Sequence, residues 1–147
     1  MINVVRVQKE DALWNRLIHY AEHCSWAAGK HLAAMLRENS FREWESVFAA
    51  LLGDEIIGYC TLPETDYYPE NRYFPWIGSV FVDEKHRGNR VSQKLIEAAA
   101  AYAKTQHFSR VYIPASMLGF YEKYGFVRID ELVNYAGDTD FIFARDL

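Results

Sequence analysis

A strand, a charged turn and a helix follow one another between Ser79 and Tyr102, and this stretch constrains the fold most strongly. Its first residues, Val80–Val82, are β-branched or aromatic and favour a strand. The charged turn Asp83–Arg90 follows. Beyond it, apolar residues recur at helical spacing and form one stripe: Val91, Leu95, Ala98, Ala99 and Tyr102. The stretch therefore predicts a strand that leads through a basic turn into an amphipathic helix.

The turn combines features that suit phosphate binding. The first backbone N–H groups of a helix have no partner within the helix and carry the positive end of its dipole. Arg87 and Arg90 add positive charge beside these groups, and Gly88 lies between them. An ordinary connection with solvated charges has the same residues, because one glycine and two arginines are not specific to a phosphate site. Both interpretations stay open at this point.

Length and composition indicate one domain over residues 1–147. A chain of 147 residues can bury a substantial core, and 50% of its residues are hydrophobic. Lys and Arg number 16 and Asp and Glu 20, which gives a net charge of −4 without a run of like charges. This balance argues against a protein that coats nucleic acid.

The cysteines, the histidines and the N-terminus favour a cytoplasmic protein without a metal site. Cys24 and Cys60 fit no C-x-x-C spacing, so both are expected to be reduced thiols. Neither the apolar block of a signal peptide nor a run of about 18 apolar residues is present, so no membrane partner is expected. The histidines of the N-terminal region are interpreted as surface or packing residues: His19, His23 and His31.

The order of the remaining segments predicts a mixed α/β domain. Strands are expected at residues 2–7, 45–52, 55–62, 76–82, 109–115, 126–135 and 140–145, and helices at 9–24, 31–37, 91–102 and 116–124. Gly29 is expected to break or bend the first helical region, and Gly125 to end the last short helix in the left-handed conformation. With a right-handed crossover, strand 109–115 runs parallel to strand 76–82. The expected result is a mixed sheet with helices on both faces.

Two motifs in this order resemble the GNAT superfamily of N-acetyltransferases. The first is similar to the acyl-CoA signature of that family and consists of Arg87, Gly88, Asn89, Arg90, Val91 and Ser92. The second, Gly119–Phe126, is similar to the late family motif of an aromatic or leucine, a tyrosine, a charged pair and Gly-Phe. The resemblance covers nearly the whole chain. It implies a mixed, mostly antiparallel sheet with a parallel, splayed central strand pair and helices on both faces.

The chain departs from the family pattern at three positions. Arg90 and Ser92 stand where the family usually has glycine and glycine or alanine. We expect Arg90 to keep helical φ and ψ and to point outward, with its charge available to a phosphate, and Ser92 to add a hydroxyl donor. The asparagine often found after the later central strand is absent. Ser116 occupies this region, where it can replace one hydrogen bond or, as we favour, cap the short helix.

The resemblance also implies a co-substrate and roles for particular residues. Acetyl-CoA is the expected co-substrate, held through its pyrophosphate by the Arg87–Ser92 turn, with no metal. Main-chain groups of the preceding strand are expected to hold the acetyl carbonyl and the pantetheine arm: Val80, Phe81 and Val82. Tyr121 is placed at the sulfur, where a phenol with a pKa near 10 can donate a proton to the leaving thiolate. Tyr124 fits a core position better.

The acceptor is expected to be a small-molecule or peptide amine, and loop 63–75 is the segment predicted to receive it. This loop combines aromatic rings, which attract an ammonium group, with the carboxylates of Glu64, Asp66 and Glu70. We select Asp66 as the residue that binds or deprotonates the amine, and His23 is a weaker candidate for a base. The alternative is a surface loop whose tyrosines cover the edge of the sheet.

Two other functions remain compatible with the sequence. The chain can be a module of the same fold that binds acyl-CoA without turnover, or it can bind another phosphate ligand. Tyr121 favours the enzyme over the module, and the missing G-x-G-x-x-G motif disfavours a dinucleotide site. The sequence does not distinguish a monomer from a homodimer. It also leaves open which amine is the acceptor.

Overall fold

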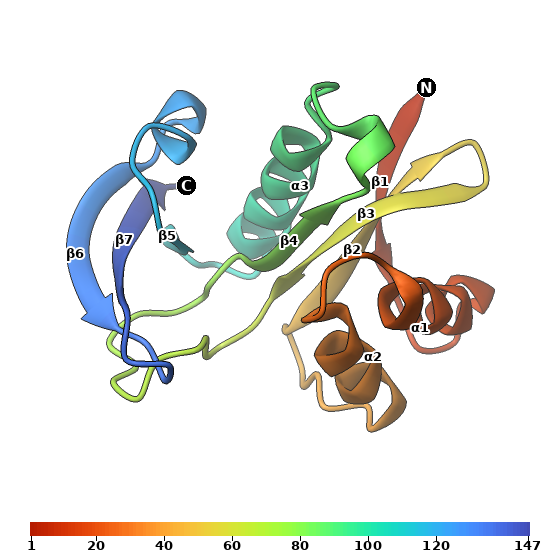
Figure 1. Cartoon of the computed structure of the whole chain (residues 1–147), viewed down its shortest axis with the longest axis horizontal. Helices are drawn as coiled ribbons and strands as arrows, with labels where there is room; N and C mark the ends of the chain where they lie inside the picture. The colour runs from red at the N-terminus through yellow and green to blue at the C-terminus, as the bar shows by residue number, and fades with distance from the viewer.

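The computed structural model describes residues 1–147 and has a mixed α/β fold (Figure 1). The strands are β1 Ile2–Val7, β2 Ser46–Leu52, β3 Glu55–Leu62, β4 Gly78–Val82, β5 Arg110–Ala115, β6 Val127–Val133 and β7 Thr139–Asp146. The helices are α1 Ala12–His23, α2 Gly29–Arg37 and α3 Val91–Thr105, with the short 3₁₀ helices η1 Glu84–His86 and η2 Tyr121–Tyr124. The predicted element order is confirmed. No helix is both long enough and apolar enough to cross a membrane.

The strands form two antiparallel sheets that lie side by side (Figure 1). The first has the order β1-β2-β3-β4 and the second the order β5-β7-β6. A single parallel bridge between Trp76 and Tyr112 connects them. There the Ile77 N–H donates to the Tyr112 carbonyl at 2.7 Å, and the Tyr112 N–H donates to the Pro75 carbonyl at 3.1 Å. The parallel relation expected between residues 76–82 and 109–115 is therefore limited to one bridge.

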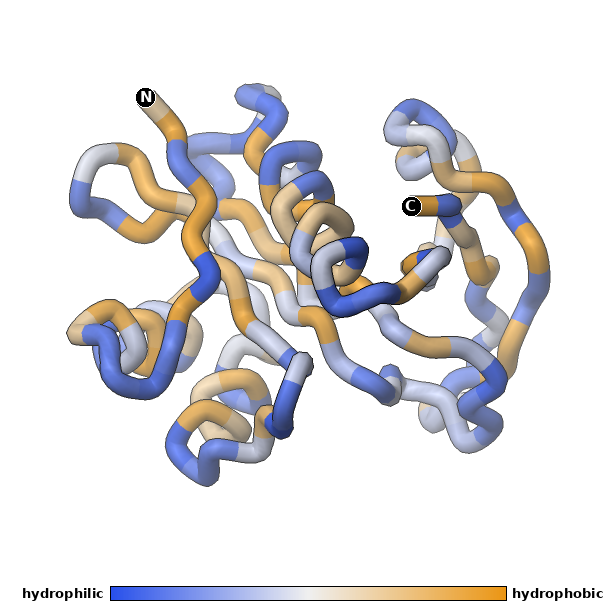
Figure 2. Tube along the Cα trace, turned by 180° about the vertical axis from the view of Figure 1, so that it is seen from behind, coloured by the Kyte–Doolittle hydropathy of each residue, from blue (hydrophilic) through white to orange (hydrophobic).

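The four-stranded sheet has a hydrophobic core on each face. Along β2, Val47 and Ala49 pack with residues of α1 and α2, whereas Phe48 and Ala50 pack with α3 on the opposite face. Because both faces are covered, β2 and β3 are almost continuously apolar, as strands buried on both sides must be. The turns between elements are mostly hydrophilic (Figure 2).

Gly29 does not break a helix, because it is the first residue of α2. It is buried against α1, and a β-carbon at this position would lie 2.1 Å from the Ala21 carbonyl oxygen. Glycine is therefore required for the close approach of α1 and α2. The two helices together cover one face of the sheet.

The helix expected over residues 116–124 is wrong in its first half. Only the 3₁₀ helix η2 forms, and the residues before it are irregular. Gly119 has a φ of 98°, a left-handed conformation that interrupts a right-handed helix. Ser116 consequently does not cap the helix, since Phe120 is the residue at its start and no side chain caps it. Gly125 ends η2 with a φ of 85°, as expected.

Candidate active site

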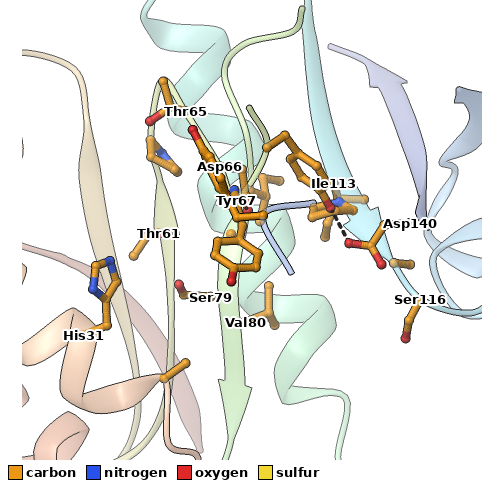
Figure 3. Close-up of a pocket in the computed structure, with 18 of the residues that line it drawn as sticks. His31, Thr61, Thr65, Asp66, Tyr67, Ser79, Val80, Ile113, Ser116 and Asp140 are labelled. Carbon is orange, nitrogen blue, oxygen red and sulfur yellow. Dashed lines mark hydrogen bonds between the residues drawn. The ribbon is translucent and has the colours of Figure 1, made fainter. Parts of the chain in front are cut away.

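A cavity of about 770 Å³ lies beside the bridge between the two sheets. Its walls come from the α1–α2 connection and α2, from the end of β3, from β4, from the end of β5, from η2, from loop 63–75 and from the β6–β7 hairpin with the start of β7. Figure 3 shows His31 on the α2 side, Asp140 and Ser116 on the opposite side, and Tyr67 between them. Four of the residues selected from the sequence line the cavity: Asp66, Val80, Ser116 and Tyr121.

A β-bulge shapes the β4 wall of the cavity. Gly78 pairs with Thr61 and Phe81 with Tyr59, so Ser79 and Val80 together face Cys60 alone. Ser79 has a φ of 50°, a left-handed conformation that costs a non-glycine residue about 1–2 kcal/mol. Bulges of this kind redirect the chain next to functional sites. No sequence signal revealed the bulge, because serine does not mark a left-handed position.

The two later residues of this strand lie off the cavity wall. The side chain of Phe81 is buried in the core beneath α1 and α2. Val82 packs toward α3 and accepts a hydrogen bond through its carbonyl. Their predicted main-chain contacts with acetyl-CoA remain predictions.

Asp66 is the acidic residue of loop 63–75 that faces the cavity. Its Oδ1 accepts a hydrogen bond from the Tyr67 N–H at 2.6 Å. Burial raises the pKa of Asp66 to about 6, the Tyr67 N–H opposes this rise, and the negative charge of Asp140 adds to it. Asp66 therefore exchanges its proton close to neutral pH. Glu64 and Glu70 are exposed and do not line the cavity.

The same loop is anchored on the second sheet by its aromatic residues. The Tyr68 hydroxyl donates to Asp140 Oδ2 at 2.8 Å, and the Tyr73 hydroxyl donates to Asp130 Oδ2 at 2.7 Å. Tyr68 packs with Trp76 against that sheet. The tyrosines in part of the loop therefore cover the second sheet, as in the alternative interpretation of the sequence. Asp66 and Tyr67 nevertheless remain in the cavity wall.

Asp140 and His31 line the cavity and were missed by sequence reasoning. Asp140 Oδ2 also accepts a hydrogen bond from Asn134 Nδ2 at 3.0 Å. No Lys or Arg side chain lines the cavity, and His31 is its only basic residue. His23 lies elsewhere, exposed on α1 with its Nδ1 2.9 Å from the His19 carbonyl oxygen. No group of three or more His, Cys, Asp or Glu residues is arranged to hold a metal ion.

Tyr121 reaches the cavity from η2 with its ring fixed by aromatic neighbours. The rings of Phe126 and Phe143 meet it edge to face, with centroids 6.2 and 6.3 Å away. Burial, with a smaller contribution from Tyr124, raises the pKa of Tyr121 to about 12. Its hydroxyl therefore keeps its proton throughout the neutral range and can donate it. Tyr124 does not line the cavity.

The Arg87–Ser92 turn lies outside the cavity, at the far end of β4. Arg87 Nε donates to the Val82 carbonyl at 3.0 Å, so the side chain folds back onto the end of the strand. Gly88 and Arg90 are both left-handed, with φ values of 86° and 60°. The expectation of helical dihedrals at Arg90 is therefore wrong: the chain enters α3 through a conformation that glycine adopts without strain.

The N-terminus of α3 presents its free N–H groups to this turn. No side chain caps the helix. The turn joins to the cavity through β4, which advances roughly 3.3 Å per residue. A ligand lying along β4 would therefore reach from the helix N-terminus to the bulge.

Comparison with known proteins agrees with this architecture. The model of the Acetyltransferase (GNAT) family matches residues 14–126. The structure of aminoglycoside 6'-acetyltransferase type Ii has a TM-score of 0.74 at 17% identity, over 98% of this chain and 96% of that chain. A GNAT family acetyltransferase from Elizabethkingia anophelis with acetyl-CoA bound has a TM-score of 0.69 at 17% identity, over 99% and 98% of the two chains.

A third structure, aminoglycoside 6'-N-acetyltransferase complexed with coenzyme A, has a TM-score of 0.71 at 14% identity, over 98% of this chain and 96% of that chain. At such identities the likeness establishes the fold alone. The search of curated proteins found no significant sequence match. Because the family model covers most of the sequence, the chain belongs to the GNAT family of acetyltransferases.

Proposed function

We propose that the protein transfers an acetyl group from acetyl-CoA to the amine of a small molecule, by direct attack within a ternary complex. One observation carries this proposal: a single cavity holds a carboxyl group with a pKa of about 6 and a phenol with a pKa of about 12. A base that titrates near neutral pH and an acid that stays protonated are the two groups that such a transfer uses.

Acetyl-CoA is expected to bind along β4. Its pyrophosphate would meet the N–H groups of α3 and the charges of Arg87 and Arg90, and its thioester would lie at the bulge. The two similar structures that contain acetyl-CoA or coenzyme A support this co-substrate. Ser92, Asn89 and Gly88 complete the turn.

The acceptor amine approaches from the other side of the cavity. Asp66 accepts a proton from the ammonium group, and the neutral nitrogen attacks the thioester carbonyl to form the C–N bond. Main-chain N–H groups at the bulge stabilise the oxyanion of the tetrahedral intermediate. As the C–S bond breaks, the nitrogen loses its second proton to solvent, the Tyr121 hydroxyl protonates the departing thiolate, and solvent returns a proton to Tyr121. Asp66 then releases its own proton to solvent, so that one proton is released per turnover.

The test is thioester consumption from acetyl-CoA over a panel of amines, with Tyr121→Phe as the diagnostic variant. Loss of the hydroxyl should lower kcat by about ten- to a thousandfold and leave acetyl-CoA affinity nearly unchanged. Tyr124→Phe is the matched control, since Tyr124 lies on the same 3₁₀ helix outside the cavity. Binding of acetyl-CoA without consumption by any amine would instead indicate the non-catalytic module.

A further inference from the structure

The cavity carries negative charge that the protein does not neutralise. Asp66 and Asp140 both line it, no Lys or Arg side chain does, and the one basic lining residue, His31, lies on the side opposite Asp140 (Figure 3). The two carboxyl groups are close enough that the charge of Asp140 contributes to the raised pKa of Asp66. An occupant that brings positive charge would therefore be stabilised, and one that brings negative charge would be repelled.

The two carboxyl groups have different surroundings, which suggests different tasks. Asp66 is pressed against β4 at the entrance to the bulge, beside the position proposed for the thioester. Asp140 belongs to β7, and both hydrogen bonds that orient it, from Tyr68 and Asn134, go to Oδ2. Asp140 Oδ1 accepts no hydrogen bond from the protein and is available to a ligand.

Two aromatic rings line the same cavity as Asp140. Tyr67 and Tyr135 line the cavity with their ring centroids 5.5 Å apart, and both side chains are more than half exposed. The Tyr135 N–H donates to the Tyr67 carbonyl at 3.1 Å, so the loop and the hairpin hold the two rings together. Such rings attract a cation through their faces and pack against methylene groups.

We propose that the acceptor carries two amino groups, one that reacts beside Asp66 and a second ammonium group that binds Asp140 on the side of the cavity lined by Tyr67 and Tyr135. The inference rests on the proposed function, because it names the substrate class of that same cavity. The reacting amine gives up its proton before attack, so it does not neutralise both carboxylates. A monoamine would remove water from Asp140 without pairing its charge, which is unfavourable.

The test compares α,ω-diaminoalkanes of increasing length with the 1-aminoalkanes of equal length. For the best diamine, kcat/KM should exceed that of the matched monoamine by about ten- to a hundredfold, the value of a charge-assisted hydrogen bond. In Asp140→Asn this ratio should fall toward one. Asp138→Asn is the matched control, because Asp138 is exposed in the same hairpin and does not line the cavity. It should keep the ratio of the wild-type protein.

The outcomes separate this inference from the proposed function. If both kinds of amine consume the thioester with equal kcat/KM in the wild-type protein, the second amino group has no site and the inference is overturned, although the acetyl transfer stands. If no amine is acetylated, calorimetry with the CoA-saturated protein decides. Diamine binding that weakens in Asp140→Asn would support the inference while the proposed function fails, and no preference for the diamine would overturn it.

Discussion

The Asp66 carboxylate lies directly on the main chain of Gly78. A β-carbon at residue 78 would be 2.9 Å from Asp66 Oδ2 and 3.3 Å from Thr61 Oγ1. Gly78 does not have a left-handed φ, so a substitution here is limited by the space that the Asp66 side chain takes and not by backbone conformation. The place of the candidate base therefore depends on a missing side chain in the neighbouring strand.

Gly78→Ala should displace the Asp66 carboxylate while the fold is kept. Displacement of a reacting group from its productive position should lower kcat/KM for the amine by about ten- to a hundredfold. Because the cause lies in Asp66, Gly78→Ala should add little to the effect of Asp66→Asn in a double-mutant cycle. Fully additive effects of the two changes would show that Gly78 acts through another group.

Asp66→Asn should stabilise the protein above pH ~6 and give no gain below pH ~4. The folded protein raises the pKa of Asp66 from its ordinary value of 3.8 to about 6, so the buried carboxylate is unfavourable once it ionises. This penalty on folding is absent at low pH, where Asp66 is protonated in both the folded and the unfolded protein. It is complete above the pKa of the folded protein, where Asp66 is ionised in both. At 1.36 kcal/mol per pKa unit, the free energy of unfolding should rise by about 1–3 kcal/mol.

Urea unfolding at the two pH values measures this difference. Glu64→Gln is the matched control, because Glu64 is exposed in the same loop, and its unfolding free energy should change by less than about 0.5 kcal/mol. An equal gain for Asp66→Asn at both pH values would show that burial of the charge is not its origin.

Arg145→Met should destabilise the protein far more than Arg110→Met. Arg145 Nη1 donates to Glu97 at 2.6 Å and to the Tyr124 carbonyl at 2.9 Å, and its side chain is only 19% exposed. Its loss should lower the free energy of unfolding by about 1–3 kcal/mol. Arg110 forms an exposed pair with Asp146, worth about 0–1 kcal/mol. Thermal unfolding of both variants would measure the contrast, and equal losses would remove the special role given to Arg145.

Arg90→Gly and Arg90→Ala remove the same charge and differ in backbone strain. Since Arg90 is left-handed, the glycine variant should be more stable than the alanine variant by about 1 kcal/mol. If the charge contacts the pyrophosphate, both variants should lose CoA affinity by a similar factor of up to about tenfold, measured by calorimetry. A loss confined to the alanine variant would show that loop shape, rather than charge, determines affinity.

Local patterns in the sequence were sufficient for much of the fold. The β-branched run before Asp83 and the helical spacing after Arg90 depend only on neighbouring residues, and both elements formed as expected. Asp66 could be selected because its loop combines carboxylates with aromatic residues and directly precedes the strand expected to hold the thioester. Tyr121 followed from the resemblance of its motif to a known family.

The remaining features depend on packing that no local pattern encodes. Asp140 and His31 reach the cavity from a distant strand and a distant helix, so only the assembled sheets bring them together. Ser79 and Arg90 adopt left-handed conformations, which a serine or an arginine in a sequence does not indicate. The helix predicted over 116–124 is wrong in its first half, because the prediction gave more weight to the apolar spacing than to Gly119.

The bridge between Trp76 and Tyr112 has a mechanical consequence. It is the only β-bridge between the two sheets, so its hydrogen bonds can open without breaking a ladder in either sheet. The two sheets also share one hydrophobic core beside α3, so the bridge is a weak point in the backbone pairing and not the only connection between the halves of the molecule. Amide hydrogens of Ile77 and Tyr112 should therefore exchange with solvent faster than those in the middle of β2, and together rather than separately.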